Sequence, residues 1–336
     1  MALAVVLAGW ALTLPPPRPE TLPGHQSLTL TPPHRDVPVT LHLWYPAEQD
    51  GTPGLIGHNA LFIGTWKAEA ATPQPGAHPL VLFSHGSGGN AERLGWFASA
   101  LAEKGFVVAA PNHPGTTSRD SDPFQTPMVW QRTADLSATL DRLLTNPPTG
   151  LRIDATNITS AGFSLGGHSA LALGGARLSK AAFIAYCDQA NDQFDCGWMS
   201  AAGVDFSTID AARYEADLSD PRITGVIAID PALTPAMTPI SLNQVTRPTL
   251  ILNLGTSDTL PLALNAAPAA ARIHNASYTA LPGARHFSFL APCSRLGQII
   301  IGLAGEDNIC TDRTLRPRAQ VHADLLSAAL NFLTPP

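Results

Sequence analysis

The chain has 336 residues, of which 45% are hydrophobic and 14% are charged, enough apolar material for a large buried core. Its 20 basic and 26 acidic residues give a formal net charge of −6 without a cluster of lysines and arginines, so we expect no nucleic-acid binding. The histidines are scattered, and the sequence contains neither an HExxH nor a CxxC motif. We therefore expect no metal and no cofactor, while the composition leaves the oligomeric state open.

The N-terminal stretch 1–20, MALAVVLAGWALTLPPPRPE, is an apolar run that ends in three prolines. It is too short to span a membrane, and it resembles the apolar part of a signal peptide, although no basic residues precede it. We interpret it as a possible signal or leader segment and expect a periplasmic or secreted protein without a stable membrane span. The alternative is a buried first element of the fold.

Four cysteines form two close pairs in the sequence, Cys187 with Cys196 and Cys293 with Cys310. An even number of locally paired cysteines is typical of disulfides in an exported protein. The alternative is a cytosolic enzyme with four reduced, buried thiols. The pairing and the N-terminal run together favour export.

The hydrophobic pattern changes from alternating to continuous in the first half of the chain. Residues 27–32 and 39–47 alternate, which predicts antiparallel strands. Next, in chain order, the patterns predict a buried strand at 79–86, a helix at 90–105 bounded by Asn90 and Gly105, a second buried strand at 106–115 and a helix at 130–144. We therefore expect the parallel sheet to begin after the antiparallel strands.

The alternation of strands and helices continues to the C-terminus with one interruption. The patterns predict a buried strand at 157–164, a helix at 165–176, buried strands at 223–232 and 248–258, a short strand and turn at 276–287, and a closing helix at 317–333. Between them, about 178–221 is rich in Asp and reads as a cap-like insertion. This order predicts an α/β fold with a mostly parallel central sheet and helices on both faces, formed as one domain by residues 21–336.

The segment Gly162-Phe163-Ser164-Leu165-Gly166 matches G-x-S-x-G. Chance alone gives such a match in about one chain in eight of this composition, so the context decides its meaning. The segment ends a predicted strand and opens a predicted helix, as a nucleophile elbow does, and glycines on both sides relieve the crowding of so tight a turn. We predict Ser164 as a catalytic nucleophile; the alternative is a polar residue in a glycine-rich turn.

A nucleophilic serine needs a base from a loop after a late strand. His286 follows the last predicted strand and lies in a turn, so we predict it as the base. His85 and His113 end earlier strands, and His168 lies on the helix after Ser164. For these three histidines we expect structural roles.

An acid must orient the histidine, and the chain order should be serine, acid, histidine. Asp258 and Asp230 both follow buried strands, at the sheet edge where open α/β sheets place their sites. We favour Asp258, because it follows the strand that precedes the histidine strand. Asp230 remains the alternative.

Two backbone N–H groups are needed to stabilise the oxyanion of an acyl-transfer intermediate. One belongs to Leu165, the residue after the predicted nucleophile. The glycine-rich loop SHGSGGN follows the first buried strand, and its Ser87 is the predicted second donor. The alternative is a flexible glycine-rich turn.

Several stretches together resemble the α/β-hydrolase superfamily, and within it the exported dienelactone hydrolase-like proteins and the platelet-activating-factor acetylhydrolases. They are LHLWYPAEQD, LVLFSHGSGG, LAEKGFVVAAPNHPG, DLSATLDRLL, SAGFSLGGHSA, DPRITGVIAIDPAL and GARHFSFLAPC. The resemblance implies a Ser–His–Asp esterase with Ser164, His286 and the oxyanion donors Ser87 and Leu165.

Details of the resemblance concern the acid, the nucleophile and one disulfide. The acetylhydrolases place their acid where Asp230 stands, whereas typical esterases place it where Asp258 stands. Small dienelactone hydrolases use a cysteine nucleophile at the position of Ser164, so lactone chemistry does not follow. The resemblance also supports a Cys293–Cys310 bridge.

Together these patterns predict a serine carboxylic ester hydrolase that forms an acyl-enzyme and acts on short-chain, aryl or lipid-type small-molecule esters. Trp198, with Phe194 and Met199, either lines an acyl or aromatic pocket or forms a structural cap. The alternative functions are a non-catalytic binding module of the same fold, and an amidase or peptidase with the same triad.

Overall fold

The computed structural model describes residues 12–189, 196–304, 309–310 and 316–334, so most of the expected leader segment lies outside the described residues. Within them one ten-stranded sheet has the order β10-β9-β8-β7-β5-β6-β2-β1-β4-β3. The strands are β1 (Gly24–Leu30), β2 (Val39–Tyr45), β3 (Thr52–Ile56), β4 (Thr65–Glu69), β5 (His78–Ser84), β6 (Val107–Pro111), β7 (Ile153–Phe163), β8 (Gly225–Ile229), β9 (Thr249–Asn253) and β10 (Ala276–Ala280). The predicted strands are thus all present, and β3 and β4 are additional.

The sheet is parallel from β6 to β10 and mostly antiparallel beyond β6. β5 pairs in parallel with both β6 and β7, and the parallel pairing continues through β8 and β9 to β10. β2 is antiparallel to β6, β1 is antiparallel to β2, and β3 is antiparallel to β4. The predictions of a mostly parallel sheet and of N-terminal antiparallel strands are confirmed.

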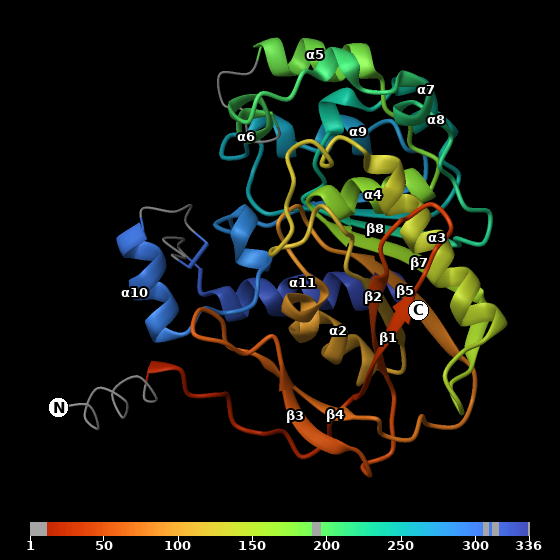
Figure 1. The fold of residues 1–336 in the computed structure, drawn as a ribbon, viewed down its shortest axis with the longest axis vertical. Helices are drawn as coiled ribbons and strands as arrows, with labels where there is room; N and C mark the ends of the chain where they lie inside the picture. Colours follow the sequence, from red (N-terminus) through yellow and green to blue (C-terminus); the bar gives the residue numbers. More distant parts are fainter. Residues whose placement is uncertain (1–11, 190–195, 305–308, 311–315, 335–336) are drawn as a thin grey trace.

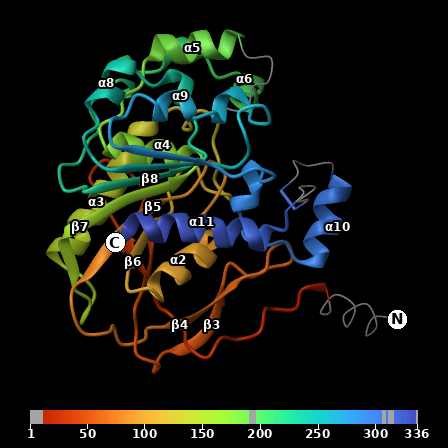
Figure 2. The same cartoon turned by 180° about the vertical axis from the view of Figure 1, so that it is seen from behind.

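Helices cover both faces of the sheet, which explains why the parallel strands β6, β8 and β9 are buried along their whole length. Successive residues of β5 enter different cores: Leu80 and Leu82 pack with α3 (Val129–Thr145) and α4 (Leu165–Leu173), whereas Val81 and Phe83 pack with α2 (Gly95–Ala102) and α11 (Arg318–Leu333). Figures 1 and 2 show these two helix layers on opposite sides of the sheet. The sheet therefore separates two hydrophobic cores.

The predicted helix 90–105 begins as the 3₁₀ turn η1 (Ala91–Leu94) and continues as α2. The side chain of Asn90 accepts a hydrogen bond from the backbone N–H of Arg93 at 3.1 Å, which is the expected N-cap contact. Gly105 follows the helix with φ 97°, a conformation that favours glycine. Both predicted boundary residues are confirmed.

The segment between α4 and β8 contains short helices that lie beyond α4, at the end of the molecule opposite β3 and β4 (Figure 1). They are α5 (Lys180–Gln189), α6 (Gly197–Ala201), η2 (Phe206–Thr208) and α7 (Ala211–Tyr214). A disulfide joins Cys187 and Cys196. The division into a single domain 21–336 with a cap-like insertion at about 178–221 stays a prediction.

The remaining elements follow β8 and connect the last strands to α11. They are η3 (Thr234–Ala236), α8 (Pro239–Gln244), η4 (Leu262–Leu264), α9 (Ala267–Ala270), η5 (His286–Phe289) and α10 (Arg295–Ala304). A second disulfide joins Cys293 and Cys310, so both predicted pairings are confirmed. Phe62 forms an isolated β-bridge with Cys293, which connects this region to the loop between β3 and β4.

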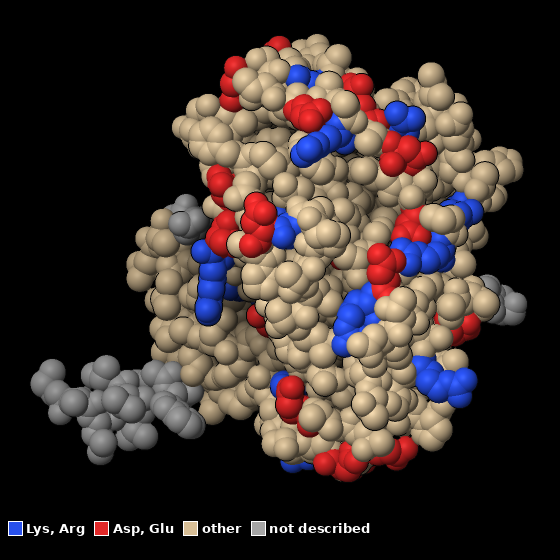
Figure 3. All heavy atoms as spheres, turned by 45° about the vertical axis from the view of Figure 1, so that its right-hand side comes forward, with Lys and Arg blue, Asp and Glu red and all other residues tan. Residues whose placement is uncertain are grey.

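Charged side chains of both signs are distributed over the surface. On the face shown in Figure 3, basic and acidic side chains adjoin one another at several places, separated by uncharged areas. Within the described ranges, no helix combines the length and the apolar character that crossing a membrane requires.

Removing the Cys293–Cys310 disulfide tests its contribution to stability. The bridge closes a loop of 17 residues, so the chain-entropy model predicts that Cys293→Ser with Cys310→Ser lowers the free energy of unfolding by about 3 kcal/mol. Denaturant unfolding of the oxidised protein measures this change. A change below about 0.5 kcal/mol would contradict the expectation, and a non-reducing mass measurement of the wild type verifies that both bridges are present.

Candidate active site

Ser164 lies in a strained turn between β7 and α4. Its backbone has φ 57° and ψ −122°, a region that a non-glycine residue rarely occupies. The flanking glycines are sterically required: a Cβ on Gly162 would lie 2.0 Å from the carbonyl oxygen of Gly166, and one on Gly166 would lie 1.9 Å from that of Ser84. The crowding expected of a nucleophile elbow is therefore present.

Backbone hydrogen bonds attach this turn to β8 and to the loop after it. The N–H of Ser164 donates to the carbonyl of Ile229 at 2.9 Å, and the N–H of Ala232 donates to the carbonyl of Ser164 at 3.0 Å. Ser164 is buried, with 8% of its surface exposed. The strain at Ser164 is thus maintained by contacts from two neighbouring segments.

His286, the first residue of η5, lies between Ser164 and an aspartate. Its Nε2 is 3.1 Å from Ser164 Oγ, and its Nδ1 is 2.7 Å from Oδ2 of Asp230. In the tautomer that carries its proton on Nδ1, His286 donates to Asp230, and its Nε2 can accept a hydrogen bond from the serine hydroxyl. The ring packs on Phe163 at a centroid distance of 4.5 Å.

Asp230, not Asp258, contacts His286. The prediction that Asp258 is the acid beside His286 is therefore wrong. Asp258 is exposed, and a hydrogen bond from the side chain of Thr256 lowers its pKa. Asp230 is fully buried. Its Oδ1 accepts hydrogen bonds from Asn253 Nδ2 at 2.8 Å and from the N–H of Leu254 at 2.7 Å.

The physical reason for this correction is the strand order. β8 is the direct neighbour of β7, and β9 lies one strand further away, so the residue that ends β8 is nearer to the turn at Ser164. Asp230 has φ 46°, a left-handed conformation that aspartate tolerates better than most residues. The end of β9 supplies Asn253 and Leu254, which hold the carboxylate of Asp230.

Ser87 and Leu165 border the space above Ser164. Leu165 is the first residue of α4, where a backbone N–H has no partner within the helix. Ser87 belongs to the loop after β5 and lines the same cavity as Ser164 and Leu165. This placement is compatible with the predicted oxyanion donors, whose role stays a prediction.

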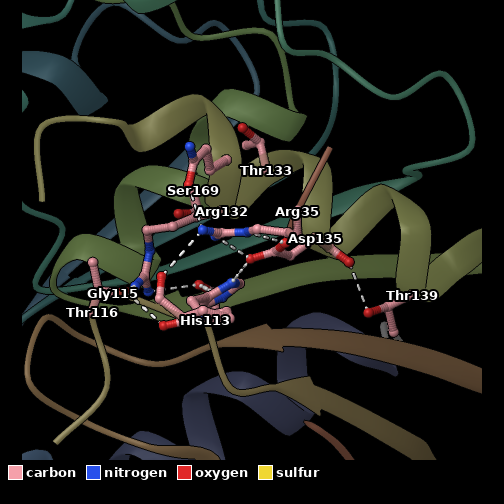
Figure 4. A network of polar contacts seen from close by, with 12 residues as sticks. Arg35, His113, Gly115, Thr116, Arg132, Thr133, Asp135, Thr139 and Ser169 are labelled. Carbon is pink, nitrogen blue, oxygen red and sulfur yellow. Dashed lines mark hydrogen bonds and ion pairs between the residues drawn. The ribbon is translucent and has the colours of Figure 1, made fainter. Parts of the chain in front are cut away.

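Figure 4 shows a buried polar network around His113, Arg132 and Asp135. This network also contacts the loop that carries Ser87. His113 donates its backbone N–H to Nε2 of His85 at 3.1 Å, and Nδ1 of His85 donates to the carbonyl of Gly86 at 2.7 Å. Arg132 of α3 donates to the carbonyl of His85 and to Ser84 Oγ. His85 and His113 are therefore structural, as expected.

Asp135 is the acidic centre of this network. His113 donates to it at 2.8 Å, His34 at 2.8 Å, and Arg35 with two nitrogens at 2.9 and 2.6 Å. Burial alone would raise the pKa of Asp135, but these hydrogen bonds outweigh burial and hold the pKa well below its usual range. Burial lowers the pKa of the enclosed Arg132 to about 9.

Sequence reasoning missed this network, although the helix pattern contained a signal. Arg132 and Asp135 lie on the face of α3 that also buries Leu136 and Leu140. A charged residue on the apolar face of a helix needs a buried partner. Arg35, one of these partners, comes from a proline-rich segment about 100 positions earlier, which no local pattern connects to α3.

His168 is buried in α4, and Nδ1 of its ring has no hydrogen-bond partner among the described residues. Burial, with a smaller contribution from Arg132, lowers the pKa of His168 to about 3. The same causes, opposed by Asp135, lower the pKa of His113 to about 3. Both histidines are therefore neutral in the folded protein at ordinary pH.

Two cavities meet at Ser164 and His286. The first, of about 330 Å³, is apolar and aromatic and is bordered on the side of α5–α7 by Phe183, Trp198, Met199 and Tyr214. The second, of about 370 Å³, is bordered by Phe62, Asn90, Arg93, Leu290 and Ile301, among others. Trp198 and Met199 thus line a pocket, which is one of the two alternatives left open for them, and Phe194 lies outside the described residues. Across the described ranges, no cluster of three or more His, Cys, Asp or Glu side chains could hold a metal ion.

Comparisons with known proteins agree with this architecture. The model of the alpha/beta hydrolase family matches residues 81–298. A ferulic acid esterase from Streptomyces cinnamoneus is similar in structure, with a TM-score of 0.66 and 20% identity over 95% of this chain and 91% of that chain. No curated protein sequence matches the chain.

A second solved structure is also similar. It is a dienelactone hydrolase-like promiscuous phosphotriesterase from metagenomic libraries, with a TM-score of 0.52 and 13% identity over 92% of this chain and 97% of that chain. At these identities the two structures establish the shared fold.

The buried neutral histidines make stability depend on pH. The pKa of His168 in the folded protein lies below its value of about 6.5 in the unfolded chain. Its contribution to the free energy of unfolding is therefore complete above pH 6.5 and is lost as the pH falls toward 3. His168→Gln is expected to reduce the slope of unfolding free energy against pH by about 1.4 kcal/mol per pH unit between pH 5.5 and 4. Urea unfolding at several pH values measures the slope.

His274→Gln, at an exposed position, is the control variant for this slope. If both His168→Gln and His274→Gln show the same slope as the wild type, the prediction is contradicted.

Proposed function

Since the chain belongs to the alpha/beta hydrolase family, we propose that it is a serine hydrolase of carboxylic esters in which Ser164 is the nucleophile, His286 the general base and Asp230 the orienting acid. The observation that carries the proposal is the continuous hydrogen-bonded chain from Asp230 through His286 to Ser164. Its members come from the ends of β7 and β8 and from the turn after β10, in the chain order serine, acid, histidine that is typical of this fold.

In the proposed acylation step, His286 Nε2 takes the proton of Ser164 Oγ while Oγ attacks the ester carbonyl. A bond forms between Oγ and the carbonyl carbon, and the tetrahedral intermediate carries its negative charge on the former carbonyl oxygen. When the bond to the alcohol oxygen breaks, the imidazolium of His286 returns the proton to the leaving alcohol. Asp230 stabilises the imidazolium and holds its orientation.

The negative charge of the intermediate requires nearby N–H donors. The backbone N–H groups of Ser87 and Leu165 are the proposed oxyanion donors. The buried contacts of Arg132 with His85 and Ser84 support the loop before Ser87, so the donor is held in place before the substrate binds. Such preorganised donors contribute about 3 kcal/mol each to transition-state stabilisation.

Deacylation reverses these roles with water as the nucleophile. His286 removes a proton from water, the resulting oxygen bonds to the acyl carbon, and the bond to Ser164 Oγ breaks as Oγ regains the proton. The products are a carboxylic acid and the free enzyme.

The proposed substrates are short-chain, aryl or lipid-type esters. The aromatic side chains of Phe183, Trp198 and Tyr214 border the first cavity, a setting that suits an apolar or aromatic group. A cavity of this size accepts a small acyl or aryl group. The fold shared with a ferulic acid esterase supports an aryl ester as the first substrate to test.

We further propose that the protein is periplasmic or secreted. The support is the presence of two disulfides, which persist in oxidising compartments, together with the apolar N-terminal run of the sequence.

Alanine and asparagine variants test the triad on 4-nitrophenyl butyrate. Ser164→Ala and His286→Ala are expected to lose about four orders of magnitude or more in kcat/KM, since the hydroxyl or its base is missing. Asp230→Asn is expected to lower kcat by about 10⁴-fold, because the amide does not hold the required tautomer.

Asp258→Asn is the matched control and is expected to stay within about twofold of the wild type. Full activity of Ser164→Ala would refute the proposed nucleophile. Greater loss in Asp258→Asn than in Asp230→Asn would reverse the assignment of the acid.

A further inference from the structure

The second cavity at Ser164 contains a basic side chain that the proposed chemistry does not use. Arg93, in the turn η1 before α2, lines this cavity together with Ser164 and His286. Its guanidinium carbon lies 3.9 Å from the centroid of the Phe62 ring. Stacking on an aromatic ring holds the planar guanidinium while leaving its N–H donors able to bind another group.

The wall that positions Arg93 is rigid. Phe62 is buried, its N–H donates to Oδ1 of Asn59 at 3.0 Å, and it bridges to Cys293 of the second disulfide. The N–H of Arg93 itself donates to the cap Asn90 at 3.1 Å. The backbone of Arg93 and the Phe62 ring on which its guanidinium stacks are therefore both held beside the cavity.

No carboxylate of the described residues lies within ion-pair distance of Arg93. The adjacent Glu92 has other contacts, with Oε2 3.1 Å from Asn112 Nδ2 and Oε1 3.7 Å from His42 Nε2. Burial lowers the pKa of Arg93, Glu92 opposes this effect, and the nearby positive charge of Arg119 adds to it. A half-buried guanidinium in this setting gains from a ligand that brings a negative charge.

From this arrangement we propose that the second cavity binds an anionic group of the ester, and that Arg93 is the residue that selects it. This inference rests on the proposed esterase function and assigns the substrate class: an ester with a carboxylate on one side of the scissile bond and an apolar or aromatic group on the other. The carboxylate lies against Arg93, and the apolar group fills the cavity lined by Phe183, Trp198 and Tyr214. Arg93 is a specificity residue and takes no part in proton transfer.

Two pairs of chromogenic esters test the selection and determine which side of the ester carries the charge. The acyl-side pair is mono(4-nitrophenyl) glutarate against 4-nitrophenyl pentanoate. The alcohol-side pair is 5-butyryloxy-2-nitrobenzoate against 4-nitrophenyl butyrate. For each pair, the measured quantity is kcat/KM of the charged ester divided by kcat/KM of the uncharged ester. In one of the two pairs, Arg93→Gln is expected to lower this ratio by about 10- to 100-fold, mainly because KM for the charged ester rises.

Further variants separate selection from a structural role. Arg93→Lys keeps the charge but not the planar fork, so it should retain part of the ratio. Arg119→Gln removes an exposed neighbouring charge and should change the ratio by less than about threefold. If Arg93→Gln lowers kcat/KM of charged and uncharged esters equally, or leaves both ratios within threefold of the wild type, the proposal is overturned.

A binding measurement keeps this test separate from the proposed catalysis. Glutarate and 5-hydroxy-2-nitrobenzoate contain no ester bond, and calorimetry reports their binding whether or not the protein hydrolyses esters. One of them is expected to bind the wild type about 10-fold or more tightly than Arg93→Gln. Equal binding to both proteins counts against the anionic subsite, whereas undiminished ester hydrolysis by Ser164→Ala counts only against the proposed serine mechanism.

Discussion

The geometry of the site depends on the crowding of main chains around Ser164. Gly166 packs against the carbonyl of Ser84 so closely that a methyl group would not fit, and Ser164 exchanges backbone hydrogen bonds with Ile229 and Ala232. The ends of β5, β7 and β8 are thereby held at one point. Each of these strand ends carries a part of the site: the Ser87 loop, the serine and Asp230. A shift of any one strand end would disturb all three parts, which explains why the strained conformation at Ser164 persists.

A second constraint is the buried charge network beneath the Ser87 loop. Enclosing Arg132 and Asp135 is costly, since two charges leave water, and their hydrogen bonds offset this cost only when the geometry is good. The donors to the Asp135 carboxylate come from two parts of the chain, His34 with Arg35 and His113. Arg132 is linked to His113 through Ser84 Oγ. The network thus connects the N-terminal segment, α3 and the loop after β6 in one arrangement. Apolar side chains of similar volume often stabilise a fold as well as a buried ion pair does. The feature specific to this network is its contact with the loop after β5, where Arg132 donates to Ser84 and His85.

Most of the framework was readable from the sequence because its signals are local. Continuous apolar runs predicted β5 to β9, and the G-x-S-x-G segment placed Ser164 between a strand and a helix. The edge strand β3 and its neighbour β4 were missed, since Pro53, Gly54 and Lys67 interrupt any strand pattern. The choice between Asp230 and Asp258 could not be made locally, because both aspartates follow buried strands. The order of the strands and the contact with His286 distinguish them. Asn253 and Leu254 lie close to Asp258 in the sequence but donate to Asp230, so sequence proximity favoured the wrong aspartate.

The two cavities that meet at Ser164 are bordered by different parts of the chain. The apolar cavity is bordered by the segment that contains α5 to α7 and the Cys187–Cys196 disulfide, whereas the Arg93 cavity is bordered by the loop after β3 and the region of the Cys293–Cys310 disulfide. Both regions lie outside the parallel sheet, so their side chains can change without altering the strand ends that hold Ser164 and Asp230. The side chains proposed to select the substrate are thus separate from the proposed triad. Because the Phe62 ring contacts Arg93 and the Phe62 backbone forms a β-bridge with Cys293, the region of the second disulfide contributes to the wall of the Arg93 cavity.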